Sequence, residues 1–208
     1  MAIKAILFDT EMVRAILEGR KSCTRRIVKP QQLIGMLPDK CKNGAPEKFL
    51  KEKKLMFKPY CDMTDIELIN TAYKAPYQPG DILYVRETWK KAPNGYYYYE
   101  DWQRNDIADV TKWKPSIRMP KEAARIWLKV TDVRVERLQE ISAESALAEG
   151  ADKYIHTNGG LDENMTITSF IGIWNSTIKK SDIDRYGWDA NPYVWNIEFE
   201  RCEKPEGV

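Results

Sequence analysis

Leu17-Glu18-Gly19-Arg20-Lys21-Ser22-Cys23-Thr24-Arg25-Arg26 is the stretch on which the fold of this 208-residue chain depends. It follows an apolar run over 3–8, which predicts a first strand, and a helical pattern over 10–18 that Thr10 can cap. Gly19 predicts the end of that helix, because glycine adopts the left-handed turn at little steric cost. The basic residues after it therefore leave a turn and enter an extended segment.

That extended segment, residues 23–28, predicts a second strand carrying closely spaced polar side chains. In a strand, Thr24 and Arg26 share one face and Arg25 points to the other, since side chains alternate. Lys21 and Thr24 are three positions apart, so a regular strand would separate them. We expect them to converge only if Lys21 lies in the turn before the strand begins.

The rest of the chain alternates strand and helix patterns. A turn at 79–81 precedes a strand with apolar residues on both faces, which indicates a central position, and Asn94-Gly95 is a hairpin signal. Further strands are predicted at 125–134 and 193–201, and further helices at 142–150 and 166–178. About five or six strands with short helices between them favour an α+β fold built on a small mixed β-barrel.

Two segments lack this periodicity and are read as surface insertions in one domain spanning residues 1–208. The first insertion covers about 31–78, where a short hairpin of 54–58 with 68–73 is expected, and the second covers about 91–115. The lysine-rich run in the first is interpreted as a solvated face.

Composition excludes several classes of function. The net charge is only +2, so nucleic-acid contact requires a local basic patch. The four cysteines form no CxxC pair, and one histidine gives little basis for a His-dependent catalytic triad. We expect no metal site and no cofactor. No signal peptide or membrane span is visible, which favours a reduced, cytoplasmic protein.

Four residues are candidates for chemistry on spacing alone. A threonine hydroxyl beside a partly buried lysine can act as a nucleophile with its base, so Lys21 and Thr24 form one candidate pair; the alternative is a basic surface turn. Glu87 is either a pocket carboxylate or the partner of a neighbouring arginine. Glu149 ends a helix, where the helix dipole disfavours a carboxylate, so it needs a cation such as Lys21 or Arg26.

Several sequence blocks in order resemble the ASCH domain family of the PUA-like superfamily, in the decorated form common in phages and prophages. The blocks are Ile16-Leu17-Glu18-Gly19-Arg20-Lys21 with Thr24 and Arg26, Gly80-Asp81-Ile82-Leu83-Tyr84-Val85, Val85-Arg86-Glu87-Thr88-Trp89, Trp113-Lys114-Pro115-Ser116-Ile117, Met119-Pro120, and Trp188-Asp189-Ala190-Asn191-Pro192 before Val194-Trp195. The resemblance implies a PUA-like barrel with a cleft that binds RNA or a modified nucleoside.

One branch of that family removes the acyl group from N4-acetylcytidine, and its motif matches part of this chain. The resemblance implies Lys21, Thr24 and Glu149 as catalytic residues and Arg26 as the arginine of the block. We expect Arg26, Glu87 and Trp89 to bind the substrate, and the choice between Glu149 and Glu87 as the pocket acid stays open. This chain is about twice the length of that branch's members, with two insertions.

Three functions and two mechanisms therefore remain as alternatives. The first function is an amidohydrolase acting on N4-acylated cytidine; the alternative is a non-catalytic module for RNA or modified nucleic acid. A phage accessory protein acting through partner proteins is a third possibility. In the enzyme, either neutral Lys21 deprotonates Thr24, or Glu149 moves the proton and cationic Lys21 stabilises the oxyanion.

Overall fold

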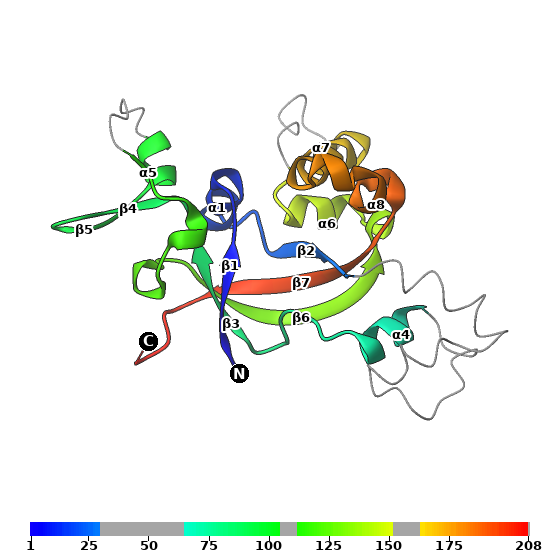
Figure 1. Cartoon of the computed structure of the whole chain (residues 1–208), viewed down its shortest axis with the longest axis horizontal. Coiled ribbons are helices and arrows are strands. Elements are labelled where there is room, and N and C mark those ends of the chain that lie inside the picture. Colours follow the sequence, from blue (N-terminus) through cyan, green and yellow to red (C-terminus); the bar gives the residue numbers. More distant parts are fainter. Residues whose placement is uncertain (30–64, 105–111, 152–162, 208) are drawn as a thin grey trace.

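The computed structural model describes residues 1–29, 65–104, 112–151 and 163–207, and its main feature is a strongly curved five-stranded sheet (Figure 1). The strand order is β1-β3-β6-β7-β2, with β1 and β3 parallel and the other neighbours antiparallel. The strands are β1 (Ile3–Leu7), β2 (Cys23–Ile27), β3 (Ile82–Arg86), β6 (Trp127–Arg137) and β7 (Tyr193–Cys202). β3, which follows the turn at 79–81, has a neighbouring strand on each side, as the apolar residues on both of its faces predicted.

Helices lie on both sides of this sheet (Figure 1). Helices α1, α6, α7 and α8 lie on one side, whereas α4 lies on the other side, near one end of β6. A separate hairpin of β4 and β5 leads into α5. The bounds are α1 (Thr10–Leu17), α4 (Asp65–Ala72), β4 (Trp89–Ala92), β5 (Gly95–Tyr98), α5 (Tyr99–Arg104), α6 (Ala143–Ala148), α7 (Glu163–Thr177) and α8 (Ile183–Tyr186).

The expected barrel is not closed in the described part of the chain. β1 and β2 are the two edge strands, and they do not pair with each other. Side chains occupy the gap instead: Arg26 donates to the carbonyl oxygen of Leu7 at 3.0 Å, and the Tyr77 hydroxyl donates to that of Ala5 at 2.9 Å. The carbonyl groups of β1 thus accept hydrogen bonds from side chains. In a closed barrel, the backbone N–H groups of a neighbouring strand would donate to them instead. The fold is α+β, with an open seam between β1 and β2.

Two local predictions are wrong. Residues 65–72 form α4 where half of a hairpin was expected, and Ile69 on this helix is fully buried in the main core, so this part of the first insertion is not a surface excursion. The other half of that hairpin, 54–58, lies outside the described residues. Asp9 rather than Thr10 caps α1, because its carboxylate accepts from the backbone nitrogen of Met12 at 2.8 Å. The division into one domain with two insertions stays a prediction.

Asp81 ties the start of β1 to the turn before β3. Its carboxylate accepts from the backbone nitrogens of Ala2 at 2.9 Å and Gln78 at 3.1 Å, and from Lys4 Nζ at 2.6 Å. The hydrogen bond from Lys4 lowers the pKa of Asp81, with the backbone bonds adding to it against the opposing effect of burial.

We expect Asp81→Asn to lower the free energy of unfolding by about 1–3 kcal/mol near pH 7, because three donors lose a charged acceptor whose side chain is buried. A carboxylate whose pKa is lowered stabilises the fold above its unfolded pKa of about 3.9, and that contribution is lost as the pH falls. Urea unfolding should therefore show a difference between wild type and variant that shrinks from pH 7 towards pH 3. A constant difference over this range would contradict the assigned charge.

Candidate functional site

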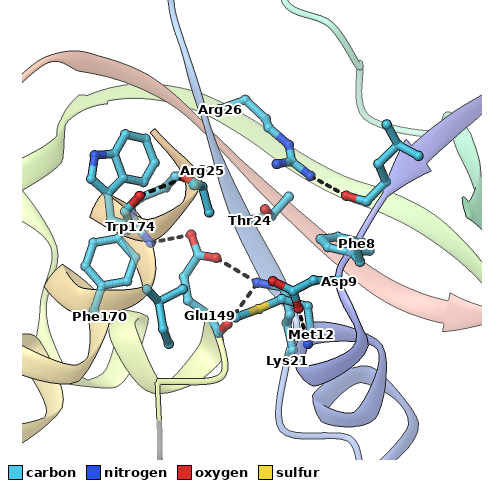
Figure 2. Close-up of a pocket in the computed structure, with 13 residues that line it drawn as sticks. Phe8, Asp9, Met12, Lys21, Thr24, Arg25, Arg26, Glu149, Phe170 and Trp174 are labelled. Atoms are coloured by element: carbon cyan, nitrogen blue, oxygen red, sulfur yellow. Dashed lines mark hydrogen bonds and ion pairs between the residues drawn. The ribbon is translucent and has the colours of Figure 1, made fainter. Parts of the chain in front are cut away.

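A small pocket lies where the sheet fails to close, between the end of β1 and strand β2 (Figure 2). Its cavity volume is about 130 Å³. One part of the wall is polar and is formed by Lys21, Thr24, Arg25, Arg26 and Glu149. The other part is mainly apolar and includes Phe8, Met12, Phe170, Ile173 and Trp174. The pocket therefore joins a charged cluster to an aromatic surface.

The turn after α1 places Lys21 against the end of α6. Gly19 adopts a positive φ of 77°, and the backbone nitrogen of Lys21 donates to the carbonyl of Ala15 at 3.1 Å. The backbones of Lys21 and Glu149 form an isolated antiparallel bridge. Gly150, with φ 87°, permits this approach, since a Cβ there would lie 3.1 Å from Cβ of Ala15. Lys21 thus precedes the strand in the turn, as its convergence with Thr24 requires.

Three oxygen acceptors surround the amine of the Lys21 side chain. Nζ donates to the carbonyl oxygens of Cys23 at 2.8 Å and Glu149 at 2.9 Å, and to Glu149 Oε2 at 2.7 Å. An ammonium has three donors, and all three have acceptors here. A neutral amine would turn its lone pair towards an oxygen. The side chain is only 1% exposed, and Nζ lies 5.5 Å from the Phe8 ring centroid.

Two cations flank the carboxylate of Glu149. Lys21 Nζ contacts Oε2, and Arg25 Nη1 donates to Oε1 at 3.2 Å. Arg25 is itself fixed by Glu136, at 2.6 Å from Nη2, and by Ser145 Oγ at 2.7 Å. Because Glu149 caps the C-terminal end of α6, where the helix dipole is negative, these cations offset an unfavourable position. The expected cationic neighbour is therefore Lys21 together with Arg25, rather than Arg26.

Thr24 and Arg26 lie on the same face of β2, as strand alternation predicted (Figure 2). Thr24 is buried and lines the pocket, and its hydroxyl forms no hydrogen bond to another described residue. Arg26 reaches across the open seam to the carbonyl of Leu7, with its guanidinium 5.5 Å from the Phe8 ring centroid. The Thr24 hydroxyl is thus available beside the Lys21–Glu149 pair.

Sequence reasoning missed Arg25 as a pocket residue and did not predict that Phe170 and Trp174 line the pocket. Strand alternation assigned Arg25 to the face opposite Thr24, where it contacts Glu149 and the Phe170 ring, yet residues of both faces of β2 line the pocket. Phe170 and Trp174, from α7, have ring centroids 6.2 Å apart. The helical spacing of these two aromatics was visible in the sequence, although it could not tell a pocket wall from a core.

The structure places Glu87 and Trp89 outside this pocket. Glu87 is buried and receives two hydrogen bonds from Arg125, both at 2.9 Å. Burial raises the pKa of Glu87, while Arg125 opposes that shift. Trp89 is buried in a second apolar cluster with Met119 and Trp127. Of the two acids considered from sequence, Glu149 is the one that lines the pocket.

Cys23 gives a pH-dependent prediction at this site. Burial, followed by the charge of Glu149, raises the pKa of its thiol to about 11, although Lys21 and Arg25 act in the opposite direction. Since the thiolate is the reactive form, we expect Cys23 to react slowly with iodoacetamide at pH 8 and faster as the pH approaches 11. Site-resolved mass spectrometry of the labelled chain checks this. Rapid labelling of Cys23 at pH 8 would contradict the buried, protonated thiol.

The described residues show neither a candidate metal site nor a candidate membrane span. No cluster of three or more histidine, cysteine or acidic residues suited to a metal ion occurs among them. In the same part of the chain, no helix combines the length and apolar character needed to span a membrane. His156 lies outside the described residues.

Comparison with known proteins gives a distant structural likeness. No protein-family model matches the chain, and no curated protein does either. Among solved structures, the chain is similar to an ASCH domain from Lactobacillus crispatus JV V101, at 10% identity and a TM-score of 0.42. The alignment covers 96% of this chain and 79% of that one. At this level of likeness, the function of the chain can be inferred only from its own residues.

Proposed function

We propose that the pocket between β1 and β2 binds the acylated base of an N4-acylated cytidine and hydrolyses its amide bond. The observation that carries the proposal is the buried Lys21–Glu149 ion pair beside Thr24, whose hydroxyl lacks a hydrogen bond to the described residues. The sequence resemblance of the 16–26 block supports the same assignment. The cavity of about 130 Å³ is smaller than the roughly 300–1,000 Å³ of drug-sized sites, which suits a single acylated base.

In the proposed reaction, the Thr24 hydroxyl attacks the carbonyl carbon of the acyl group. Glu149 takes the hydroxyl proton and then returns it to N4, so the C–N bond breaks and cytidine leaves as the free amine. Water hydrolyses the acyl-threonine and releases the carboxylic acid. Lys21 exchanges one carbonyl acceptor for the oxyanion of the tetrahedral intermediate. This assignment uses the cationic form of Lys21, which its three acceptors support.

The base would lie against the aromatic part of the wall. Phe170 and Trp174 line the cavity, and aromatic rings commonly stack on nucleobases. Arg25 and Arg26 have separate tasks in this proposal. Arg25 holds Glu149 in position from behind, whereas Arg26, which is only half-buried, lies where the sugar and phosphate would leave the pocket.

A non-catalytic binding module is the second candidate. One observation favours it: all three donors of Lys21 are satisfied within the protein, as they would be in a purely structural ion pair. The same pocket would then recognise a modified base of RNA or another nucleic acid without cleaving it. The two candidates share the ligand and differ in turnover.

Turnover of N4-acetylcytidine tests the proposal. The purified protein is incubated with N4-acetylcytidine, and cytidine and acetate are quantified by liquid chromatography. An Nε-acetyl-lysine amide provides the control for unspecific amidase activity. We expect cytidine and acetate in equal amounts from the nucleoside and no release from the lysine amide. Absence of cytidine above a heat-inactivated control would remove the enzyme proposal, while saturable binding without turnover would favour the binding module.

A further inference from the structure

A larger groove adjoins the pocket on the side of α4. Two hollows of about 470 and 720 Å³ share Tyr73, Lys74, Tyr77 and Trp195, so they form one continuous groove. Arg26 lines the first hollow and also the small pocket, and it therefore stands at the junction between them. The pocket and the groove thus follow one path along the open side of β2.

The groove combines aromatic rings with positive charge. Tyr73 and Tyr77 are partly exposed, and the buried Trp195 contributes to the wall. The side chains of Arg26, Lys29 and Lys74 supply three cations, and no aspartate or glutamate occurs among the described residues that line either hollow. Lys74 is exposed and forms no ion pair with any described residue. Rings that accept bases and cations that accept phosphates are what single-stranded nucleic acid requires.

Tyr77 is held in place before any ligand arrives. Its hydroxyl donates to the carbonyl of Ala5 at 2.9 Å, and Lys4 Nζ lies 5.8 Å from its ring centroid. A ring fixed in this way loses little conformational freedom when a base stacks on it. The lysines, by contrast, are exposed and can adapt to a flexible phosphate backbone.

We propose that this groove binds the nucleotides that flank a modified cytosine in a single-stranded polynucleotide, with Arg26 at the entry of that base into the pocket. The inference rests on the proposed function in one respect, since it makes the pocket's substrate a base within a strand. The small pocket leaves no room for neighbouring nucleotides, and the groove beside it provides that room.

Fluorescence anisotropy with labelled ten-residue oligonucleotides tests the groove. We use unmodified oligocytidine as RNA and as DNA, together with an abasic strand of the same length. We expect at least one cytosine strand to bind, and the abasic strand to bind about tenfold or more weakly, because stacking on aromatic side chains is lost. RNA alone, DNA alone or both would support the groove. Equal binding of the abasic strand would overturn it, since charge attraction alone would then explain the affinity.

Variants of exposed lysines locate the binding surface. The double variant K29Q/K74Q should lower the slope of log affinity against log salt concentration by about 1.4, since each phosphate contact on a single strand contributes about 0.7. Lys204→Gln, on the exposed C-terminal tail distant from α4, is the matched control and should leave the slope unchanged (Figure 1). A similar decrease of the slope in K29Q/K74Q and in Lys204→Gln would show unspecific attraction and overturn the groove. Tyr73→Leu keeps an apolar contact and should weaken binding about tenfold.

These measurements separate the groove from the chemistry of the pocket. The oligonucleotides carry no acyl group, so binding is observed whether or not the protein hydrolyses anything. Hydrolysis of free N4-acetylcytidine without oligonucleotide binding would overturn the groove and leave the proposed function standing. Oligonucleotide binding without hydrolysis of N4-acetylcytidine would leave the groove standing and overturn the proposed function.

Discussion

Replacing Glu149 with alanine is expected to lower the free energy of unfolding by about 3–5 kcal/mol, the largest effect on stability predicted for a single side chain. The change removes the carboxylate between Lys21 and Arg25, whose side chains are each only 1% exposed. A buried charge that loses its partner keeps its desolvation cost without compensation. Chemical denaturation of wild type and variant, monitored by circular dichroism, measures the difference.

A double-mutant cycle provides the control for this result. Lys21→Met removes one of the two cations, so E149A in the K21M background should cost less than E149A alone. Arg25 retains Glu136 as a partner in both backgrounds. Equal costs in the two backgrounds would mean that Lys21 and Glu149 are not coupled, in conflict with the 2.7 Å contact between them.

Thr24→Val is expected to reduce the turnover of N4-acetylcytidine by at least about 10³-fold, the largest effect on activity, because the proposed nucleophile is absent. Valine is nearly isosteric with threonine, and the Thr24 hydroxyl has no hydrogen bond to a described residue that the change would break. Thr24→Ser, which keeps a hydroxyl, should retain much of the activity. Initial rates of cytidine release for the three proteins check this.

Binding and stability must be measured on the same proteins. Thr24→Val should bind N4-acetylcytidine within a few-fold of wild type and unfold at a similar denaturant concentration. Full activity of Thr24→Val would exclude a covalent threonine intermediate and would leave direct attack by water as the remaining hydrolytic route.

Local patterns predicted most elements of the fold but not the closure of the sheet. The Asn94-Gly95 turn, the helix capped by Ser142 and the alternation of 193–201 each depend on neighbouring residues, and each is present. Barrel closure depends on whether β1 and β2 pair, two strands separated by α1. Whether they pair depends in turn on side chains from other segments, such as Tyr77, whose hydroxyl donates to the Ala5 carbonyl. No periodicity in either strand contains this information.

From local patterns alone, the candidate site was predictable only where its residues are close together in the sequence. Lys21, Thr24 and Arg26 are close in sequence, so turn and strand geometry sufficed to place them together. Glu149 lies more than a hundred residues away, and the family resemblance together with its need for a cation suggested it. Arg25 was missed because its role depends on α6 approaching the edge of β2. For Glu87 the sequence left a pocket carboxylate and an arginine partner as alternatives, and it pairs with Arg125, which is distant in sequence.

The proposed function requires the charged cluster in the open seam to catalyse the cleavage of an acylated cytosine. Its most direct test is the release of cytidine from N4-acetylcytidine by wild type and by Lys21→Met, measured side by side at substrate concentrations that saturate both. We predict steady release by wild type and a rate at least about 10²-fold lower for the variant, because the oxyanion loses its cation. Equal rates for the two proteins, or no release by either while both bind the nucleoside, would contradict this requirement.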